Sequence, residues 1–267
     1  MTVKFYIITY NNNEILNEWI LKSLHESEYD RTKVQIFVIN NHSNIEINDE
    51  YKHFVTLLNN TLRPDFSTGH LSRNHNQAII NGFRNLKFPD CDVVISCQND
   101  TILHKNWYQS LTDIMEKYTY FSVGAGDQFQ SFKADAVRNI GLYDERFCNI
   151  GHQEADYFLR AYLYNKEYSS INDDCHSRHH NEIQDQQVIQ NTLTGGMRNE
   201  SYHLESAKHQ PISDKVFHAK WGNDIVTYGW DDNKCHTKVT DCKLKNHIYY
   251  PYFELDVIDL EGKNYLI

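Results

Sequence analysis

The sequence predicts an α/β domain over residues 1–182, in which a sheet is built from strands joined by crossover helices. Short apolar runs alternate in this part of the chain with segments whose apolar residues recur at helical spacing. The runs are rich in Val, Ile, Phe and Tyr, as is typical of strands covered on both faces. The chain has 267 residues, enough for this domain and a C-terminal extension, which we expect over residues 183–267.

Five strands are expected, and each is an apolar run followed by polar or turn-forming residues. In chain order they are "VKFYIITY" (3–10), "VQIFVIN" (34–40), "HFVTLL" (53–58), "DVVISC" (92–97) and "YFSVGA" (120–125).

Three helices are expected from stripes of apolar residues, which we assign to the core. The stripes are formed by Ile15, Leu16, Trp19, Ile20 and Leu24, by Trp107, Leu111, Ile114 and Met115, and by Ala155, Phe158, Leu159, Tyr162 and Leu163. After about residue 182 the pattern becomes polar and irregular. We therefore expect the extension to cap the core and to contribute to acceptor binding.

The composition argues against a nucleic-acid partner and favours a cytoplasmic location. The formal net charge is −10 with no long basic run, so we expect no nucleic-acid partner. The N-terminal apolar run is too short for a signal peptide, and no stretch is long enough to span a membrane, although peripheral membrane contact stays open. The six cysteines are scattered without a CxxC pair, which favours reduced thiols in a cytoplasm.

Polar residues stand at the ends of the predicted strands, where an open α/β sheet normally binds its ligand. They are "TYNNN" (9–13), "NNHSN" (40–44), "QND" (98–100) and "GAGD" (124–127). The alternative is that these residues only form turns and helix caps, with Asn99, Asp100 and Thr101 capping a helix that begins near Lys105. In the functional interpretation, Asp100 binds Mg²⁺ or Mn²⁺ together with diphosphate oxygens, because these ions need only one or two carboxylates.

Six motifs in order resemble the family 2-type glycosyltransferases of the GT-A fold over most of residues 3–182. They are "TYN" (9–11), "VINNHS" (38–43), "SRNHN" (72–76), "QNDT" (98–101), "FKADAVRNIGLYDERF" (132–147) and "HQEADYFLRA" (152–161), and "SRHH" (177–180) matches a late histidine of the family. The resemblance implies a GT-A, Rossmann-like, mixed and mostly parallel sheet flanked by helices. It also implies that a nucleotide-sugar donor contacts Thr9, Tyr10, Asn11, Asn40, Asn41, Arg73, Gln98 and Asn99.

The chain departs from the family pattern at three places. Gln98 stands where relatives carry an acid, which leaves Asp100 as the expected carboxylate for the metal. Asn40 or Asn41 replaces an Asp that contacts the nucleobase of the donor in the family, so uridine is expected as the nucleoside but this specificity stays open. The acidic pair of the family reads Gln153-Glu154 here.

An inverting transfer needs a group that removes the proton of the acceptor hydroxyl, and the candidates are Glu154 and Asp156. We favour Glu154, because it takes the position of the family's base and because Asp156 has a partner in Arg160 at i+4. The alternative is that both carboxylates only stabilise the helix N-terminus.

The histidines of "DDCHSRHH" have three possible roles. His179 or His180 would complete the metal site or touch the diphosphate, beside surface and zinc-binding alternatives that involve Cys175 and His176. For Arg73, the alternative to a phosphate contact is a plain surface charge. Trp221 and Trp230 are candidates for stacking on sugar faces.

The expected function is metal-dependent transfer of a hexosyl or deoxyhexosyl group, with inversion, to a glycan or other hydroxyl acceptor. Polysaccharide biosynthesis is the expected setting. A catalytically degenerate domain that binds a glycan or a partner is the alternative. A sugar-nucleotide nucleotidyltransferase ranks lower, because "TYNNNEIL" lacks the glycines and the cation that would hold a triphosphate.

Overall fold

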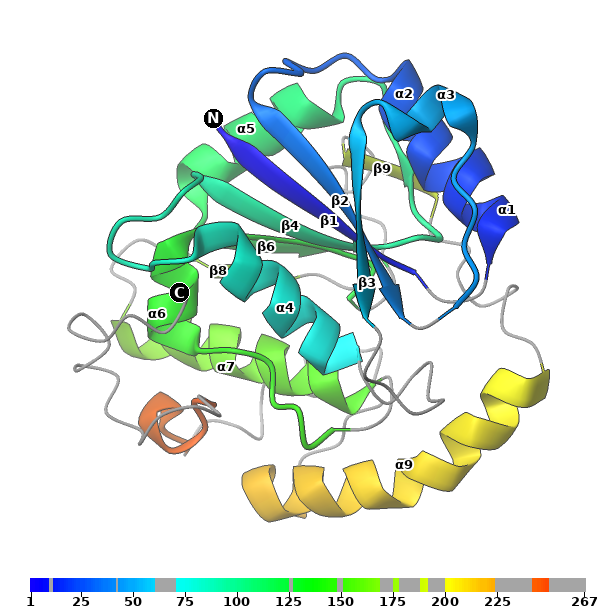
Figure 1. Ribbon diagram of the computed structural model, residues 1–267. Coiled ribbons are helices and arrows are strands. Elements are labelled where there is room, and N and C mark those ends of the chain that lie inside the picture. Colours follow the sequence, from blue (N-terminus) through cyan, green and yellow to red (C-terminus); the bar gives the residue numbers. More distant parts are fainter. Residues whose placement is uncertain are drawn as a thin grey trace.

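The computed structural model describes residues 1–9, 12–41, 43–60, 71–124, 127–147, 151–168, 175–177, 188–191, 200–223 and 242–249. Its main sheet has seven strands in the order β3-β2-β1-β4-β7-β6-β8. All the strands point the same way except β7, which is antiparallel to β4 and β6. The predicted class, a mixed and mostly parallel sheet flanked by helices, is confirmed (Figure 1).

The strands of the main sheet are β1 (Val3–Thr9), β2 (Val34–Asn41), β3 (Val55–Asn60), β4 (Val93–Gln98), β6 (Tyr120–Val123), β7 (Phe129–Phe132) and β8 (Cys175–Ser177). All five predicted strands are present, with ends shifted by no more than a few residues. A second sheet pairs β5 (Ile102–Leu103) with β9 (Ile189–Asn191).

The helical segments are α1 (Asn13–Ile15), η1 (Leu16–Leu21, a π-helix), α2 (Lys22–Glu26), α3 (Asp49–Lys52), α4 (Leu71–Phe83), α5 (Trp107–Lys117), α6 (Ala134–Ile140), α7 (His152–Tyr168), α9 (Glu200–Trp221) and η3 (Leu244–Asn246). The three predicted helices correspond to the continuous stretch α1-η1-α2, to α5 and to α7. Within the described residues, no helix combines the length and apolar character needed to span a bilayer.

The sheet has a hydrophobic core on each face, because successive side chains of a strand point to opposite faces. Phe5 and Ile7 of β1 pack in the cluster that contains residues of α1-η1-α2 and α5, whereas Tyr6 packs in the cluster of α4, α6 and α7. Figure 1 shows these two helical layers on either side of the sheet. Phe217 and Trp221 of α9 belong to the second cluster, so this helix shares the core of residues 71–168.

Glycine permits the close approach of α4 to the sheet. A side chain added at Gly82 would collide with Val94 of β4, so only a residue without a Cβ fits here. Lys4 Nζ also donates to Gly82 O at 2.9 Å. This packing fixes α4, and the motif "SRNHN" at its N-terminal end, against the strands that form the candidate site.

Candidate functional site

The parallel strands β2, β1 and β4 end side by side in polar residues, at the place where the strand order reverses. The chain proceeds from β1 to β2 and β3 on one side, and then returns to β4 on the other side of β1. Ligands of open α/β sheets bind outside the carboxyl ends of the strands at such a switch point. Thr9 pairs in register with Asn40, and Asn99 Nδ2 donates to Thr9 Oγ1 at 2.9 Å.

Asn40 and Asn41 have structural partners at this edge. Asn40 Oδ1 accepts from Ser43 Oγ at 2.8 Å, and its Nδ2 donates to Ser43 O at 2.8 Å, so this side chain closes the turn after β2. Asn41 Oδ1 accepts from Asn60 Nδ2 at 3.1 Å. A contact of either residue with a nucleobase stays a prediction. Tyr10 and Asn11, predicted to lie beside them, fall outside the described residues.

Gln98, Asn99 and Asp100 are half-buried, and they do not cap a helix. The strand β5 follows them directly, and α5 begins only at Trp107 with Asn106 as its N-cap. The capping alternative is therefore wrong. Gln128 holds the turn, because its carbonyl accepts from Gln98 N at 2.8 Å and its side-chain Nε2 donates to Asp100 O at 3.1 Å.

Few described residues could bind the metal that the resemblance implies. The part of the chain that the structure describes contains no group of three or more His, Cys, Asp or Glu residues that could hold an ion. Asp100 alone fits a Mg²⁺ or Mn²⁺ ion that takes its other ligands from diphosphate oxygens and water. His179 and His180 lie outside the described residues, as does Trp230.

A buried carboxylate connects the strand end to the helix that carries the predicted base. Asp127, only 1% exposed, lies in the connection between β6 and β7. It accepts from Gln98 Nε2 and, at 2.9 Å each, from His75 Nε2 and Gln153 Nε2. Gln153 immediately precedes Glu154, so two hydrogen bonds link the first turn of α7 to the end of β4.

Neither Asp127 nor His75 was predicted as a site residue. Both lie in segments that the sequence singled out, "GAGD" and "SRNHN", but nothing in either segment identifies the partner in the other. The pairing arises because α4 and the β6–β7 connection meet behind β4. His75 Nδ1 is also 2.7 Å from Ser96 Oγ, and the imidazole stacks on Tyr143 at 4.6 Å between ring centroids.

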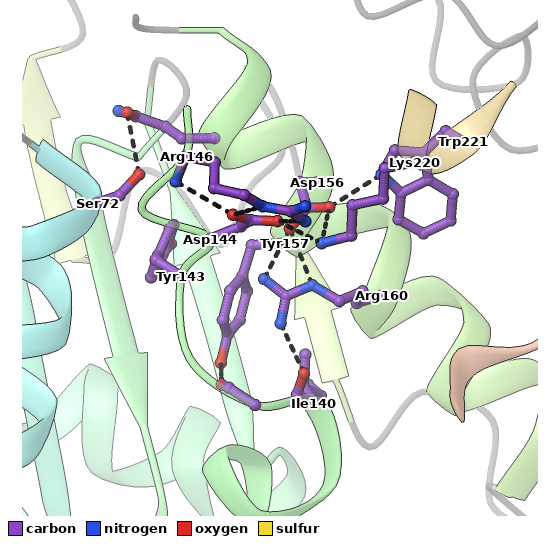
Figure 2. A network of polar contacts seen from close by, with 12 residues as sticks. Ser72, Ile140, Tyr143, Asp144, Arg146, Asp156, Tyr157, Arg160, Lys220 and Trp221 are labelled. Carbon is purple, nitrogen blue, oxygen red and sulfur yellow. Dashed lines mark hydrogen bonds and ion pairs between the residues drawn. The ribbon is translucent and has the colours of Figure 1, made fainter. Parts of the chain in front are cut away.

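Glu154 and Asp156 have different surroundings. Glu154 is 7% exposed, and its Oε2 accepts from Gly151 N at 2.7 Å, as a carboxylate at a helix N-terminus does. Asp156 is fully buried, and both of its oxygens are engaged. Oδ2 binds Arg160 at 2.8–3.0 Å, and Oδ1 binds Lys220 Nζ at 2.6 Å and Trp221 Nε1 at 2.9 Å (Figure 2). The expected Asp156–Arg160 pair is confirmed, and the role of Glu154 as the general base stays a prediction.

Asp156 is part of a buried ionic cluster that joins α7 to α9. Lys220 Nζ also reaches Asp144 Oδ2 at 3.0 Å, and Arg146 binds the same carboxylate at 2.6 Å (Figure 2). Burial raises the pKa of Asp144, but the hydrogen bond from Arg146 and the charge of Lys220 outweigh it and lower the pKa to about 2. Burial lowers the pKa of Lys220, while the two carboxylates act in the opposite direction.

Two further predicted residues lie apart from these contacts. The side chain of Arg73 is 55% exposed in the first turn of α4, with Nε 3.3 Å from Glu145 Oε2, and its contact with a diphosphate stays a prediction. The expectation that Trp221 stacks on a sugar is wrong. Its indole is buried, donates to Asp156 and stacks on His247 at 4.0 Å between ring centroids.

The protein has an α/β fold, and its candidate ligand site lies at the switch point of the sheet, where the polar ends of β1, β2 and β4 are found. No protein-family model matches the chain, and no curated protein matches it in sequence. Solved structures that it resembles include Staphylococcus aureus TarS 1-349 with UDP, at 12% identity and a TM-score of 0.46, with 61% of this chain and 55% of that chain covered. The same TarS fragment with UDP-GlcNAc matches at 9% identity and a TM-score of 0.48, covering 91% and 74%.

A mannosyltransferase from Pyrobaculum calidifontis, bound to GDP-Man and Mn²⁺, matches at 13% identity and a TM-score of 0.48. That match covers 80% of this chain and 63% of the mannosyltransferase. The chain thus spans less than two thirds of the mannosyltransferase and of the UDP-bound TarS fragment.

Proposed function

We propose that this protein is a glycosyltransferase that moves a sugar from a nucleoside diphosphate sugar to a hydroxyl of a glycan or other acceptor. The observation that carries the proposal is the switch point between β1 and β4, where Thr9, Asn99 and Asp100 gather at the strand ends. The order of the family-like motifs along the chain supports it. The scattered cysteines support a cytoplasmic location.

The proposal gives each part of the site a role. The nucleobase would lie near Thr9 and Asn40, with uracil as the first nucleobase to test, and Asp100 would hold a Mn²⁺ or Mg²⁺ ion. The ion would neutralise charge as the nucleoside diphosphate leaves. Glu154 accepts the proton of the acceptor hydroxyl while the anomeric carbon is attacked from the opposite face, which inverts its configuration.

A ligand-binding screen tests the donor site. We expect one of UDP, GDP, CDP and dTDP to raise the melting temperature of the protein with Mn²⁺ or Mg²⁺, and EDTA to remove the shift, because a ligand of the folded state stabilises it by mass action. Asp100→Ala should abolish both the metal-dependent shift and the release of sugar from the matching donor, while the protein stays folded. A variant with full activity would remove Asp100 from the proposal.

Binding without transfer is the second candidate, and Gln98 favours it because this residue replaces the first acid of the family's metal motif. The two candidates differ in turnover. Release of nucleoside diphosphate from the bound donor, by transfer or by slow hydrolysis, supports the enzyme. A normal melting-temperature shift without any release, across a broad panel of acceptors, supports the binding domain.

A further inference from the structure

Asp127 brings together three segments that are far apart in the sequence. Its partners are Gln98 at the end of β4, His75 of α4 and Gln153 in the first turn of α7. Gln98 reaches Oδ1, whereas His75 and Gln153 share Oδ2. The carboxylate is 1% exposed, and His75 and Gln153 are fully buried, so this contact lies beneath the strand end rather than on its surface.

The hydrogen bonds determine which way the amide of Gln98 points. Gln98 Nε2 donates to Asp127 Oδ1, so the –NH₂ group of Gln98 faces Asp127 and the carbonyl Oε1 lies on the opposite side of the amide. Among the described residues, none donates to Gln98 Oε1. Gln98 is half-buried at the strand end, so this oxygen is available to a ligand there.

The imidazole of His75 lies between Asp127 and Ser96. With a hydrogen on Nε2 it donates to Asp127, and its Nδ1 can accept from the hydroxyl of Ser96. The carboxylate of Asp127 thus accepts from two amides and one imidazole. An acid at position 98 would put a second negative charge against Asp127, which explains why a glutamine stands there.

We infer that Asp127 is a positioning residue that turns the carbonyl oxygen of Gln98 toward the bound donor and holds the first turn of α7, with Glu154, against the same strand end. The inference rests on the proposed function. Its physical content is an orientation: the strand end presents an oxygen of residue 98, and not its –NH₂ group, beside the carboxylate of Asp100.

The test exchanges the amide and the carboxylate between the two positions. In Asp127→Asn, the new amide nitrogen can face position 98 while the remaining oxygen still accepts from His75 and Gln153. The protein keeps its hydrogen bonds only if the Gln98 amide rotates, which turns –NH₂ toward the donor. In Gln98→Glu, two carboxylates face each other. In the double variant, the new carboxylate at position 98 accepts from the new amide at position 127, and an oxygen again faces the donor.

Two measurements are made on each variant: the melting temperature without ligand, and the dissociation constants of UDP, GDP, CDP and dTDP with Mn²⁺ by titration calorimetry. Asp127→Asn should keep a melting temperature close to that of the wild type and bind the preferred nucleotide about tenfold or more weakly, as expected for a ligand oxygen replaced by a donor. Gln98→Glu should melt at a lower temperature. The double variant should recover both the melting temperature and the affinity.

Ile114→Ala serves as the control for stability, because Ile114 is buried in α5 on the opposite face of the sheet from α4 and α7. It should lower the melting temperature without changing the affinity. Wild-type affinity in Asp127→Asn, or a double variant that binds no better than Asp127→Asn, would overturn the inference. If Asp127→Asn does not fold, the double variant still decides, because it restores the full set of hydrogen bonds and must fold and bind.

Failure of the proposed function gives a different result. A wild-type protein that binds none of the four nucleotides, with either metal, refutes the donor site. The contact itself is then still measured by the melting temperatures, since destabilisation by Gln98→Glu and its recovery in the double variant require residues 98 and 127 to interact. Absence of that recovery refutes the contact, whatever the nucleotides do.

Discussion

The first turns of α7 are held by two buried polar networks that differ in charge. On one side, Gln153 donates to Asp127, which also accepts from the amide of Gln98 and the imidazole of His75. On the other side, Asp156 is surrounded by Lys220, Arg160 and the indole of Trp221. Glu154 lies between Gln153 and Asp156 in the sequence. The two networks therefore bracket the predicted base.

The difference in charge implies different tolerances to substitution. A network of amides around one carboxylate can reverse an amide and keep its hydrogen bonds, so it controls orientation at a small cost in stability. The ionic cluster has no such freedom, because the loss of one member leaves another charge buried without compensation. The first network sets directions at the strand end, and the second fastens α9 to the core.

The largest effect is expected at the residue between the networks. Glu154→Gln keeps an oxygen that can accept from Gly151 N, so the fold should persist, but the amide cannot take a proton from the acceptor. We expect turnover to fall about 10²- to 10⁴-fold, measured as release of nucleoside diphosphate under saturating donor and acceptor. Asp156→Asn should instead lower the melting temperature. Turnover equal to that of the wild type in Glu154→Gln would remove the residue from the mechanism.

The ionic cluster should respond most strongly in stability. Lys220→Met leaves the Asp144 and Asp156 carboxylates with fewer compensating charges in the core. We expect a loss of about 3–5 kcal/mol in the free energy of unfolding, measured by urea denaturation. Lys215→Met makes the same change at an exposed position of α9 and should have little effect. Equal losses in the two variants would mean that Lys220 contributes no more than a surface charge.

The sequence predicted the strands and helices whose apolar residues follow a strong periodic pattern. Four of the five predicted strands, β1, β2, β4 and β6, are buried over most of their length and so appear as continuous apolar runs. The fifth, β3, lies at the edge of the sheet and has no buried residue. The helix α9 was not predicted. Among its described side chains, Phe217 and Trp221 near its end are buried in the core and Val216 packs against them, Leu204 and Ile212 are exposed, and Pro211 interrupts the pattern. A helix buried over part of its length shows no continuous stripe.

The sequence predicted which residues lie at the candidate site, but not the hydrogen bonds that connect them. Its strand-end residues follow from the ends of apolar runs, and the preference for Glu154 follows from the local partner of Asp156, since an i+4 pair lies on one helix face. Asp127 was hidden because its partners Gln98 and His75 lie 29 and 52 residues away along the chain. Such contacts depend on how α4 packs against β4, and a local sequence pattern cannot predict them.

The amide network should respond less than the ionic one when a single member is removed. His75→Phe keeps the ring that stacks on Tyr143 but removes the hydrogen bonds to Asp127 and Ser96. We expect a loss of about 1–3 kcal/mol in the free energy of unfolding, because Gln98 and Gln153 continue to donate to Asp127. The same change at exposed His218 is the control. A loss as large as that of Lys220→Met would erase the distinction between the networks.

The smallest effect should appear as a dependence on pH at the edge of the ionic cluster. Burial, with the nearby charges of Lys220 and Arg160, lowers the pKa of His247 to about 4, against the opposing charges of Asp156 and Glu167. The unfolded chain takes up a proton at this histidine near pH 6.5, so the imidazole favours unfolding increasingly as the pH falls from about 6.5 toward 4. Above that range its effect is absent.

Replacing the titrating ring isolates this contribution. His247→Phe preserves a ring that can stack on Trp221 but cannot bind a proton. Urea denaturation between pH 7.5 and 4.5 should show the wild type losing more stability than the variant as the pH falls, with the gap confined to the acid end. His152, whose pKa burial also lowers despite Asp214, adds the same trend to both proteins. Parallel curves would mean that Lys220 and its neighbours leave His247 close to its ordinary pKa, and that the cluster's charges are compensated within it.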